Sequence, residues 1–349
     1  MKAFVIHRFG DPDVLALEEV PQPVPGRGEV CVRVAAAVVA RTKDVATRAG
    51  RPPFAAQIPR FPHVLGTEHA GVVEAVGPGA DPALVGRRVA VSSVLSCGDC
   101  RACSAGREEA CASFRLIGVH RQGSYAQYCV SPAANLHPIP DALSFVEAAA
   151  LAANAPVARA QLDAGGVGAG STVLVTGAAG ALGSTVAALA AFRGARVIGV
   201  DRLAAKPGCL DGVPLEAALD GERGDLGEAI REAARNGGLD CVVDNLGIAS
   251  LWNAYRPLLA DMGRIVVSGA VSHDALPMHL LPFYLGSQSL IGVRTGNRTQ
   301  MKKVWSDVAD GFRMPPSKVH PVPWNAVAEA HRAVERGASA GQTVLAAHL

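Results

Sequence analysis

The chain has 349 residues, of which 49% are hydrophobic and 18% are charged, and its formal net charge is +2 at pH 7. This length is more than one hydrophobic core usually holds, so we expect two domains. The small net charge argues against a nucleic acid or an anionic membrane surface as partner, and the longest apolar stretches, such as 186–191, are too short to span a membrane.

The start of the chain and its cysteines indicate the compartment. The opening stretch, MKAFVIHRFG, is interrupted by charge and by glycine too early for a signal peptide. Eight cysteines, four of them clustered, favour a metal site over disulfides in such a chain. We therefore expect a cytoplasmic protein.

The first 39 residues contain short alternating apolar runs, at 2–6 and 29–35, which are separated by the turn-rich stretch PQPVPGRGE. Alternation with a period of two, broken by glycine and proline, is typical of antiparallel strands. This region therefore predicts a β domain at the amino terminus.

A glycine-rich turn lies at 173–184, with the sequence VLVTGAAGALGS. An apolar run leads into it, an alanine-rich segment follows, and a second apolar run at 195–200 ends at Asp201. This order of strand, turn, helix and strand is the dinucleotide-binding fingerprint, in which glycines let the backbone approach a pyrophosphate at the helix amino terminus. The alternative is a glycine turn that binds no nucleotide. The residues expected to contact the cofactor here are Gly177, Ala178, Gly180, Ala181, Leu182, Gly183 and Asp201.

Further motifs extend along the whole chain: GTEHAGVV at 66–73, GRRV at 86–89, VVDNLG at 242–247, GRIVVSG at 263–269 and GQTVL at 341–345. With these motifs the chain resembles the medium-chain dehydrogenase/reductase superfamily, which comprises zinc alcohol dehydrogenases and quinone oxidoreductase-like enzymes. The resemblance implies an α/β protein with a GroES-like β catalytic domain and a Rossmann domain, whose doubly wound parallel sheet binds the dinucleotide. It also adds Lys206, Asn245, Ser268 and Gly269 to the expected cofactor contacts.

The domain boundaries follow from the resemblance and from the periodicity. We expect residues 1–150 and 293–349 in the catalytic domain, which includes a zinc lobe at 92–113, and residues 151–292 in the Rossmann domain. Strands are expected near 173, 195, 240, 264 and 289, with amphipathic helices at 226–236 and 326–336.

Four cysteines form a C-x2-C-x2-C-x7-C array: Cys97, Cys100, Cys103 and Cys111. Four thiolates at this spacing can surround a tetrahedral Zn²⁺ and leave no position open for substrate. The array matches the structural zinc lobe of the alcohol dehydrogenase branch. We therefore predict one structural Zn²⁺ per chain, and the alternative is a cluster of free thiols.

The zinc alcohol dehydrogenases of this superfamily hold a second, catalytic zinc through three side chains. The corresponding positions here are occupied by Arg41, Thr67 and Ala153. None of these side chains replaces a thiolate or imidazole ligand, so we predict that the catalytic zinc is absent. A rebuilt site from neighbouring acids and histidines is a minor alternative.

Without a Lewis acid, hydride transfer to an isolated ketone is difficult, whereas an alkene conjugated to a carbonyl, or a quinone, spreads the incoming charge. Arg41 and Lys43 are the candidate catalytic cations. Either could stabilise a developing oxyanion or bind a substrate carboxylate, and Lys43 could also donate a proton. Thr67 is expected in the pocket wall. The alternative is that both cations are solvated or pair with Asp44 and Glu68.

The sequence thus predicts an NAD(P)H-dependent oxidoreductase that has no catalytic zinc and reduces an activated C=C bond or a quinone. The alternatives are a zinc-independent alcohol dehydrogenase or carbonyl reductase, and a nucleotide-binding protein without catalysis. Asp201 favours NAD(H) over NADP(H), because its carboxylate would repel a 2′-phosphate, whereas Arg202 could pair with that phosphate. The expected partners are a small-molecule substrate and, through the apolar strand at 289–294, a second copy of the chain in a homodimer.

Overall fold

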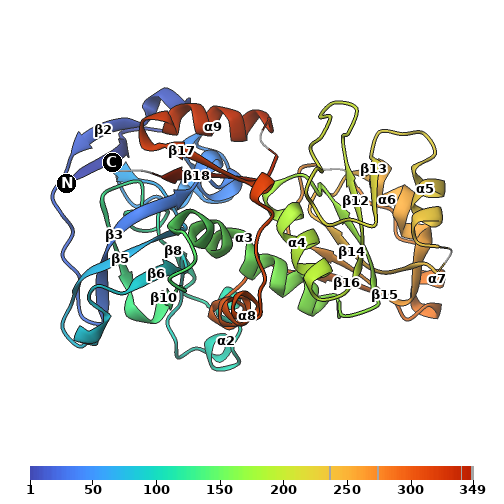
Figure 1. The fold of residues 1–349 in the computed structure, drawn as a ribbon, viewed down its shortest axis with the longest axis horizontal. Coiled ribbons are helices and arrows are strands. Elements are labelled where there is room, and N and C mark those ends of the chain that lie inside the picture. The colour runs from blue at the N-terminus through green and yellow to red at the C-terminus, as the bar shows by residue number, and fades with distance from the viewer. Residues whose placement is uncertain (236, 273–274, 339, 347–349) are drawn as a thin grey trace. The chain divides into compact units, whose positions relative to one another are not determined.

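A computed structural model describes residues 1–346 with the exception of 236, 273–274 and 339 (Figure 1). The chain divides into two compact units. Unit 1 comprises Met1–Ala153, Asn297–Asp310 and Val319–Leu349, and unit 2 comprises Asn154–Gly296 and Gly311–Lys318. Among the described residues, no helix is both long and apolar enough to span a membrane.

Unit 1 is built mainly of β-strands. Its strands are β1 (Lys2–Ile6), β2 (Ala16–Glu19), β3 (Glu29–Val38), β4 (His63–Val64), β5 (His69–Val76), β6 (Arg88–Val91), β7 (Val94–Leu95), β8 (Arg115–Leu116), β9 (Tyr128–Pro132), β10 (Leu136–Pro138), β17 (Val319–Pro323) and β18 (Gln342–Ala346). Its helices are α1 (Ala46–Arg48), α2 (Arg101–Ser104), α8 (Arg298–Ala309) and α9 (Val327–Arg336). The helix α3 (Phe145–Ala164) contributes to both units.

The long strand β3 organises unit 1. It pairs antiparallel with β5, β9 and β18, and the described part of this sheet has the order β10-β6-β5-β3-β18-β17. Residues from opposite ends of the sequence share one core cluster, in which Phe4 and Ile6 pack with Trp324 and Leu345. The carboxyl-terminal strands are therefore an integral part of the amino-terminal β unit.

Unit 2 contains a parallel sheet. Its described strands, in the order β13-β12-β11-β14-β15-β16, are β13 (Ala217–Asp220), β12 (Arg196–Asp201), β11 (Thr172–Thr176), β14 (Leu239–Asp244), β15 (Leu259–Val267) and β16 (Ser289–Gly292). Its other helices are α4 (Ala181–Phe192), α5 (Leu226–Ala233), α6 (Ala249–Tyr255) and α7 (Leu280–Leu285).

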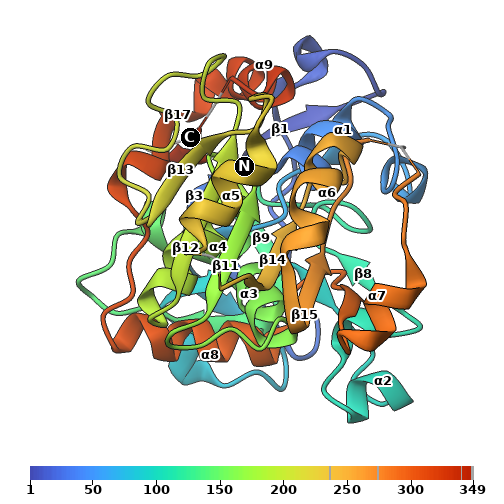
Figure 2. The same cartoon turned by 90° about the vertical axis from the view of Figure 1, so that its right-hand side faces the viewer.

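The central strands of this sheet are almost continuously apolar because helices cover both faces. One face, which includes Leu174, Ile198 and Val242, packs against α5 and α6, whereas α4 follows β11 and lies against β11 and β12 (Figure 2). The sheet is built outward from β11 in both directions: β12 pairs with one edge of β11, and β14 pairs with the other. This is the switch point at which doubly wound sheets bind ligands.

The strands predicted for unit 2 and both predicted helices, one in each unit, are present, with differences at the helix ends. The helix predicted at 226–236 ends at Ala233, and Asn236 lies outside the described residues. The helix predicted at 326–336 begins at Val327. The strand β13 was not predicted, because its four residues, AALD, show no alternating pattern and include no β-branched side chain.

Candidate functional site

The glycine turn of unit 2 joins β11 to α4. Gly177 has a φ of 64°, a conformation in which glycine is favoured, and a Cβ at Gly183 would overlap the carbonyl oxygen of Gly177. Gly180 is the N-cap residue of α4, and no side chain caps this helix. The first backbone N–H groups of α4 therefore remain as donors for a phosphate.

The acid that ends β12 lies against this turn. The Asp201 carboxylate accepts hydrogen bonds from the backbone N–H groups of Ala179, at 2.9 Å, and Arg202, at 2.9 Å. The Arg202 side chain is exposed, and Lys206 is half-buried one turn further on. The turn and the acid thus come together as the fingerprint requires.

The remaining expected cofactor residues lie at the carboxyl ends of neighbouring strands. Asn245 follows β14, and its Oδ1 accepts a hydrogen bond from Gln161 Nε2 at 2.8 Å. Ser268 and Gly269 follow β15, and the Ser268 hydroxyl donates to the backbone oxygen of Val293. A Cβ at Gly269 would lie 3.1 Å from the backbone oxygen of Asn245, so these two strand ends approach each other closely.

The four clustered cysteines of unit 1 also come together. Their Sγ atoms all lie within 4.8 Å of one another, with separations of 3.5 Å between Cys97 and Cys111 and 3.6 Å between Cys100 and Cys103. The edge of a tetrahedron with Zn–S bonds of about 2.3 Å is about 3.8 Å long. The residues present therefore fit a tetrahedral Zn²⁺ held by four thiolates, which would stabilise the lobe rather than bind substrate.

Backbone N–H groups favour the thiolate at two of these cysteines, because they lower the pKa of Cys100 and of Cys111. N–H groups directed at its sulfur lower the pKa of Cys100 to about 6, whereas a side-chain hydrogen bond with Asp99 raises the pKa of Cys97 to about 12. The lobe is attached to the start of α8, where Asn297 Nδ2 donates to the Gly106 oxygen at 2.8 Å and Arg298 Nε donates to Glu108 Oε1 at 2.7 Å. Metal binding and the position of α8 are thus physically connected.

A second cluster in unit 1 is centred on the carboxylate of Glu68, which is only 2% exposed. Lys43 Nζ forms an ion pair with Glu68 Oε1, and the Thr67 hydroxyl donates to Glu68 Oε2. The Ser93 hydroxyl donates to Oε1 at 2.7 Å. Lys43 itself is 21% exposed, so its ammonium group joins a buried carboxylate to accessible space.

Asp44 lies beneath this cluster and is fully buried. Its two oxygens accept the backbone N–H groups of Ala40, at 2.9 Å, and Gly66, at 3.2 Å. Burial raises the pKa of Asp44 to about 7, and the nearby negative charge of Glu68 adds to this effect. Burial raises the pKa of the Tyr125 phenol well above its usual value, and the negative charges of Asp44 and Glu68 add to this rise.

The two candidate cations point to different partners. They belong to a π-helical turn, η2 (Arg41–Val45), which is closed by a hydrogen bond from Val45 N to Ala40 O at 3.0 Å. The Arg41 side chain is exposed, and its Nη1 donates to the backbone oxygen of Glu335 in α9 at 3.2 Å. The structure therefore brings Lys43 and Thr67 together at Glu68, while Arg41 lies against α9.

Other members of this cluster carried no sequence signal. Ser93 lies just after β6, and the partners of the 41–51 segment in α9 lie almost three hundred residues away along the chain. Among the described residues, the four clustered cysteines are the only group of three or more His, Cys, Asp or Glu residues whose ligand atoms converge. Asp44, His63, Glu68 and His69 do not form such a group there.

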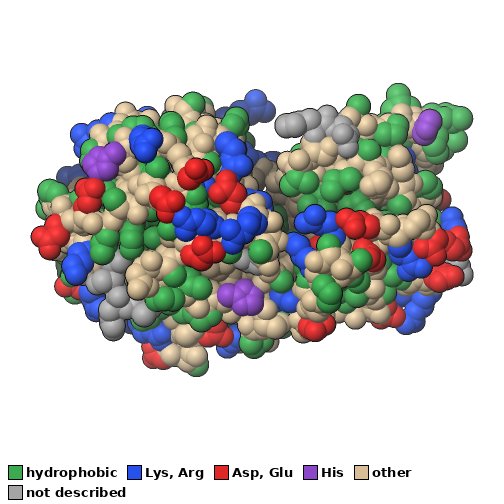
Figure 3. All heavy atoms as spheres, turned by 90° about the horizontal axis from the view of Figure 1, so that it is seen from above, with side chains coloured by type: hydrophobic (Ala, Val, Ile, Leu, Met, Phe, Trp, Pro, Cys, Tyr) green, Lys and Arg blue, Asp and Glu red, His purple; other side chains and the backbone are tan. Residues whose placement is uncertain are grey.

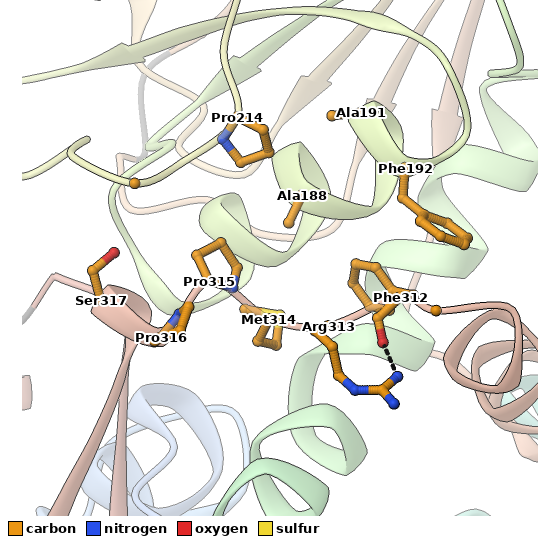
Figure 4. Close-up of a pocket in the computed structure, with 12 residues that line it drawn as sticks. Ala188, Ala191, Phe192, Pro214, Phe312, Arg313, Met314, Pro315, Pro316 and Ser317 are labelled. Carbon is orange, nitrogen blue, oxygen red and sulfur yellow. Dashed lines mark hydrogen bonds between the residues drawn. The ribbon is translucent and has the colours of Figure 1, made fainter. Parts of the chain in front are cut away.

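A hollow of about 650 Å³ lies elsewhere, in unit 2, between α4 and the segment 311–317 (Figure 4). Phe192, Pro214 and Phe312 give it a largely apolar wall. Its charged residue, Arg313, donates to the backbone oxygen of Phe312 at 2.7 Å. This lining offers no group that would act on a substrate.

Comparison with known proteins adds the following. Residues 26–141 match the family model of the alcohol dehydrogenase GroES-like domain, and residues 181–310 match that of the zinc-binding dehydrogenase. Both matches place these domains in the order that the sequence predicted.

Three similar proteins span most of the chain. The starvation-sensing protein RspB of Escherichia coli (strain K12) is 32% identical over 79% of this chain and 78% of its own. The NAD-dependent alcohol dehydrogenase of Sulfolobus acidocaldarius is 29% identical over 99% of both chains. A crystal structure of an NAD-dependent alcohol dehydrogenase has a TM-score of 0.90 and 32% identity, with complete coverage of both chains.

Proposed function

The chain belongs to the medium-chain dehydrogenase/reductase superfamily and is an NAD(P)-dependent oxidoreductase with the predicted α/β fold, and we propose that it reduces an activated C=C bond or a quinone without a catalytic zinc. The observation that supports this proposal is the Lys43–Glu68 ion pair. At the ligand positions of the zinc alcohol dehydrogenases stand Arg41 and Thr67, and beside them a lysine ammonium provides the positive charge.

A nicotinamide cofactor, held by the glycine turn and Asp201, would supply the hydride for the β-carbon of a conjugated substrate, and negative charge would then develop on the carbonyl oxygen of that substrate. One N–H of Lys43 is directed to Glu68, which leaves two others to bind the enolate oxygen. A proton then adds to the α-carbon, so that NAD(P)H and one proton are consumed for each double bond. An oriented cation that acts on developing charge chiefly raises kcat.

Lys43 is better placed for this role than Arg41, because Lys43 is held by a buried acid and Arg41 is directed to α9. The hydroxyl hydrogen of Thr67 is directed to Glu68. Thr67 is fully buried, so it contributes mainly by holding Glu68 rather than by forming the pocket wall that the sequence predicted.

We propose NAD(H) as the preferred cofactor, since Asp201 presents its carboxylate beside the glycine turn and two of the similar proteins are named NAD-dependent. We also propose a homodimer. The edge strand β16 and the helix α7 expose apolar side chains, among them Leu290, Leu281 and Tyr284, and an exposed apolar edge favours pairing with a second copy.

The names of the similar proteins favour a second candidate, an alcohol dehydrogenase or carbonyl reductase in which Lys43 polarises an isolated carbonyl. Assays of NADH oxidation with an enone, a quinone and a simple aldehyde, and of NAD⁺ reduction with a primary alcohol, distinguish the two. Turnover of the enone or quinone alone supports the first proposal. Turnover of the aldehyde and the alcohol supports the second, and cofactor binding without any turnover contradicts both.

The variant Lys43→Met tests whether the ammonium group that pairs with Glu68 takes part in the reaction. It should lower kcat by about 10²–10³-fold with little change in KM, as expected for the loss of one oriented donor. Lys302→Met, at an exposed position in α8, is the matched control and should leave both constants unchanged. A larger loss of kcat in Arg41→Met than in Lys43→Met would transfer the role to Arg41.

A further inference from the structure

Three arginines of the segment that carries Lys43 meet one residue of α9, Glu335. Arg48 Nη2 pairs with Glu335 Oε2 at 2.7 Å, and Arg51 Nη2 pairs with Oε1. Arg41 Nη1 donates to the backbone oxygen of the same residue at 3.2 Å. Both the carboxylate and the carbonyl of Glu335 are thus directed to the stretch between residues 41 and 51.

The ion pair between Arg48 and Glu335 is hard to replace, because the Arg48 side chain is fully buried and its guanidinium group cannot lose its proton. In the described part of the chain, Glu335 is the carboxylate with which it forms an ion pair. Its Nε and Nη1 atoms have no hydrogen-bond partner there. A buried cation depends strongly on its counter-charge, so the position of Arg48 follows that of Glu335.

Lys43 lies between two anchors of this segment. On the inner side, Asp44 accepts the N–H groups of Ala40 and Gly66, which ties the turn to the strands. On the outer side, Glu335 holds the arginines. The turn between the anchors is π-helical, a rare geometry that is frequently found at functional sites.

We propose that Glu335 is a positioning residue that fixes the turn around Lys43, and so directs the Lys43 ammonium at Glu68, through its contacts with Arg41, Arg48 and Arg51. This inference rests on the proposed function of Lys43. Among the described residues Glu335 contacts Arg41, Arg48 and Arg51, and it acts on the ammonium group of Lys43 through this segment. A displacement of about 1 Å at a reacting group is enough to lower a rate by about 10²-fold.

The same helix supplies a matched control. Acidic and basic side chains are interspersed on the face of the molecule over α9 (Figure 3). Glu329, also on α9, pairs with Arg332 and Arg336, neither of which belongs to the 41–51 segment. Glu329→Gln therefore removes an equal charge from α9 without releasing the segment.

Steady-state kinetics of NADH oxidation with the best acceptor of the enone and quinone panel provides the first test. Glu335→Gln should lower kcat by about 10- to 100-fold with KM changed by less than about twofold. Glu335→Asp should recover part of this loss, and Glu329→Gln should behave as the unmodified protein. In a Lys43→Met background, Glu335→Gln should have almost no further effect, since the group that it positions is gone.

The double-variant cycle separates the two ideas. If Lys43→Met leaves kcat unchanged, the proposed function fails and this inference with it. If Lys43→Met lowers kcat but Glu335→Gln lowers it by the same factor in both backgrounds, the positioning role is overturned while the proposed function stands. If Glu335→Gln does not fold, Arg51→Gln replaces it, because Arg51 is 53% exposed and its removal leaves the Arg48 pair intact.

A spectroscopic measurement needs no substrate. Reductive ¹³C-methylation labels the lysine amines, and the NMR signal of Lys43 is the one that is missing in Lys43→Arg. This signal should shift in Glu335→Gln or Arg51→Gln and stay in place in Glu329→Gln. An unchanged Lys43 signal in both of the first two variants overturns the inference.

Discussion

Asp44 is expected to make the protein less stable as the pH rises toward neutrality, which is the reverse of the usual behaviour of a carboxyl group. Complete burial raises its pKa from 3.8 to about 7 in the folded protein, and the charge of Glu68 adds to the rise. The amides of Ala40 and Gly66 and the ammonium of Lys43 act in the opposite direction but do not prevail.

The direction of this pH dependence follows from the number of protons that the folded and the unfolded chain bind. Between pH 3.8 and about 7 the folded chain keeps the proton of Asp44, whereas the unfolded chain has lost it. The contribution of Asp44 to stability is therefore complete below pH 3.8 and is lost as the pH rises through about 7. A tenfold difference in proton affinity corresponds to about 1.4 kcal/mol, so the rise in pKa from 3.8 to about 7 contributes at most about 4 kcal/mol.

The variant Asp44→Asn isolates this effect. It keeps the shape of the side chain and cannot ionise, but its single carboxamide oxygen serves only one of the two N–H donors, at a cost of about 1–3 kcal/mol. The original protein should be the more stable at pH 5, and its advantage should shrink by about 3 kcal/mol between pH 5 and pH 8.

Thermal and urea unfolding of both proteins at constant ionic strength, at pH 5, 6, 7 and 8, measures the difference directly. Loss of zinc from the cysteine cluster at acid pH affects both proteins alike and cancels in the comparison. Parallel stability curves over this range would refute the reasoning, because they would mean that Lys43 and the backbone amides compensate the charge of Asp44 completely.

Three further results are expected. Metal analysis should find one zinc ion per chain, and two zinc ions per chain would contradict the absence of a catalytic zinc. The variant Cys103→Ser should lose the zinc ion, and its Tm should fall by about 10 °C. The control Cys209→Ser, outside the cluster, should keep its zinc ion. Asp201→Ala should reduce the preference for NADH in kcat/KM by about tenfold, and a tenfold preference of the original protein for NADPH would show that Arg202 governs the site. Leu290→Asp, on the exposed edge strand, should convert a dimer into a monomer in sedimentation, and a monomeric original protein at micromolar concentration would rule out this interface.

The features that could be predicted from the sequence depend on residues close together in the chain. The glycine turn was recognisable because Gly177 needs a positive φ and Gly183 lies against its carbonyl, six residues away. The cysteine cluster spans fifteen residues, and its spacing alone restricts the metal and its geometry. Sites whose residues lie this close together in the chain can be recognised from their sequence spacing alone.

The environment of Lys43 could not be predicted in this way. Arg41 and Lys43 are two residues apart, so an extended segment would place them on one side and a helical turn on nearly opposite sides. The sequence does not reveal a π-helical turn here, and it therefore left open which cation would face Glu68. The contacts of Ser93 and Glu335 depend on tertiary packing between distant segments, for which a single sequence carries no signal.

Arg41 and Thr67, which stand where the zinc alcohol dehydrogenases hold their catalytic metal, are best understood together with Lys43. Glu68 is buried, and a carboxylate in that position needs a cation nearby. On the proposal made here, Lys43 supplies that charge and Asp44 remains protonated up to about neutral pH. Restoring cysteine at Arg41 and histidine at Thr67 would then not restore zinc binding, because the ammonium of Lys43 would repel a second cation beside Glu68. On this proposal, the residues at positions 41 and 67 and the lysine at 43 are coupled through one buried carboxylate.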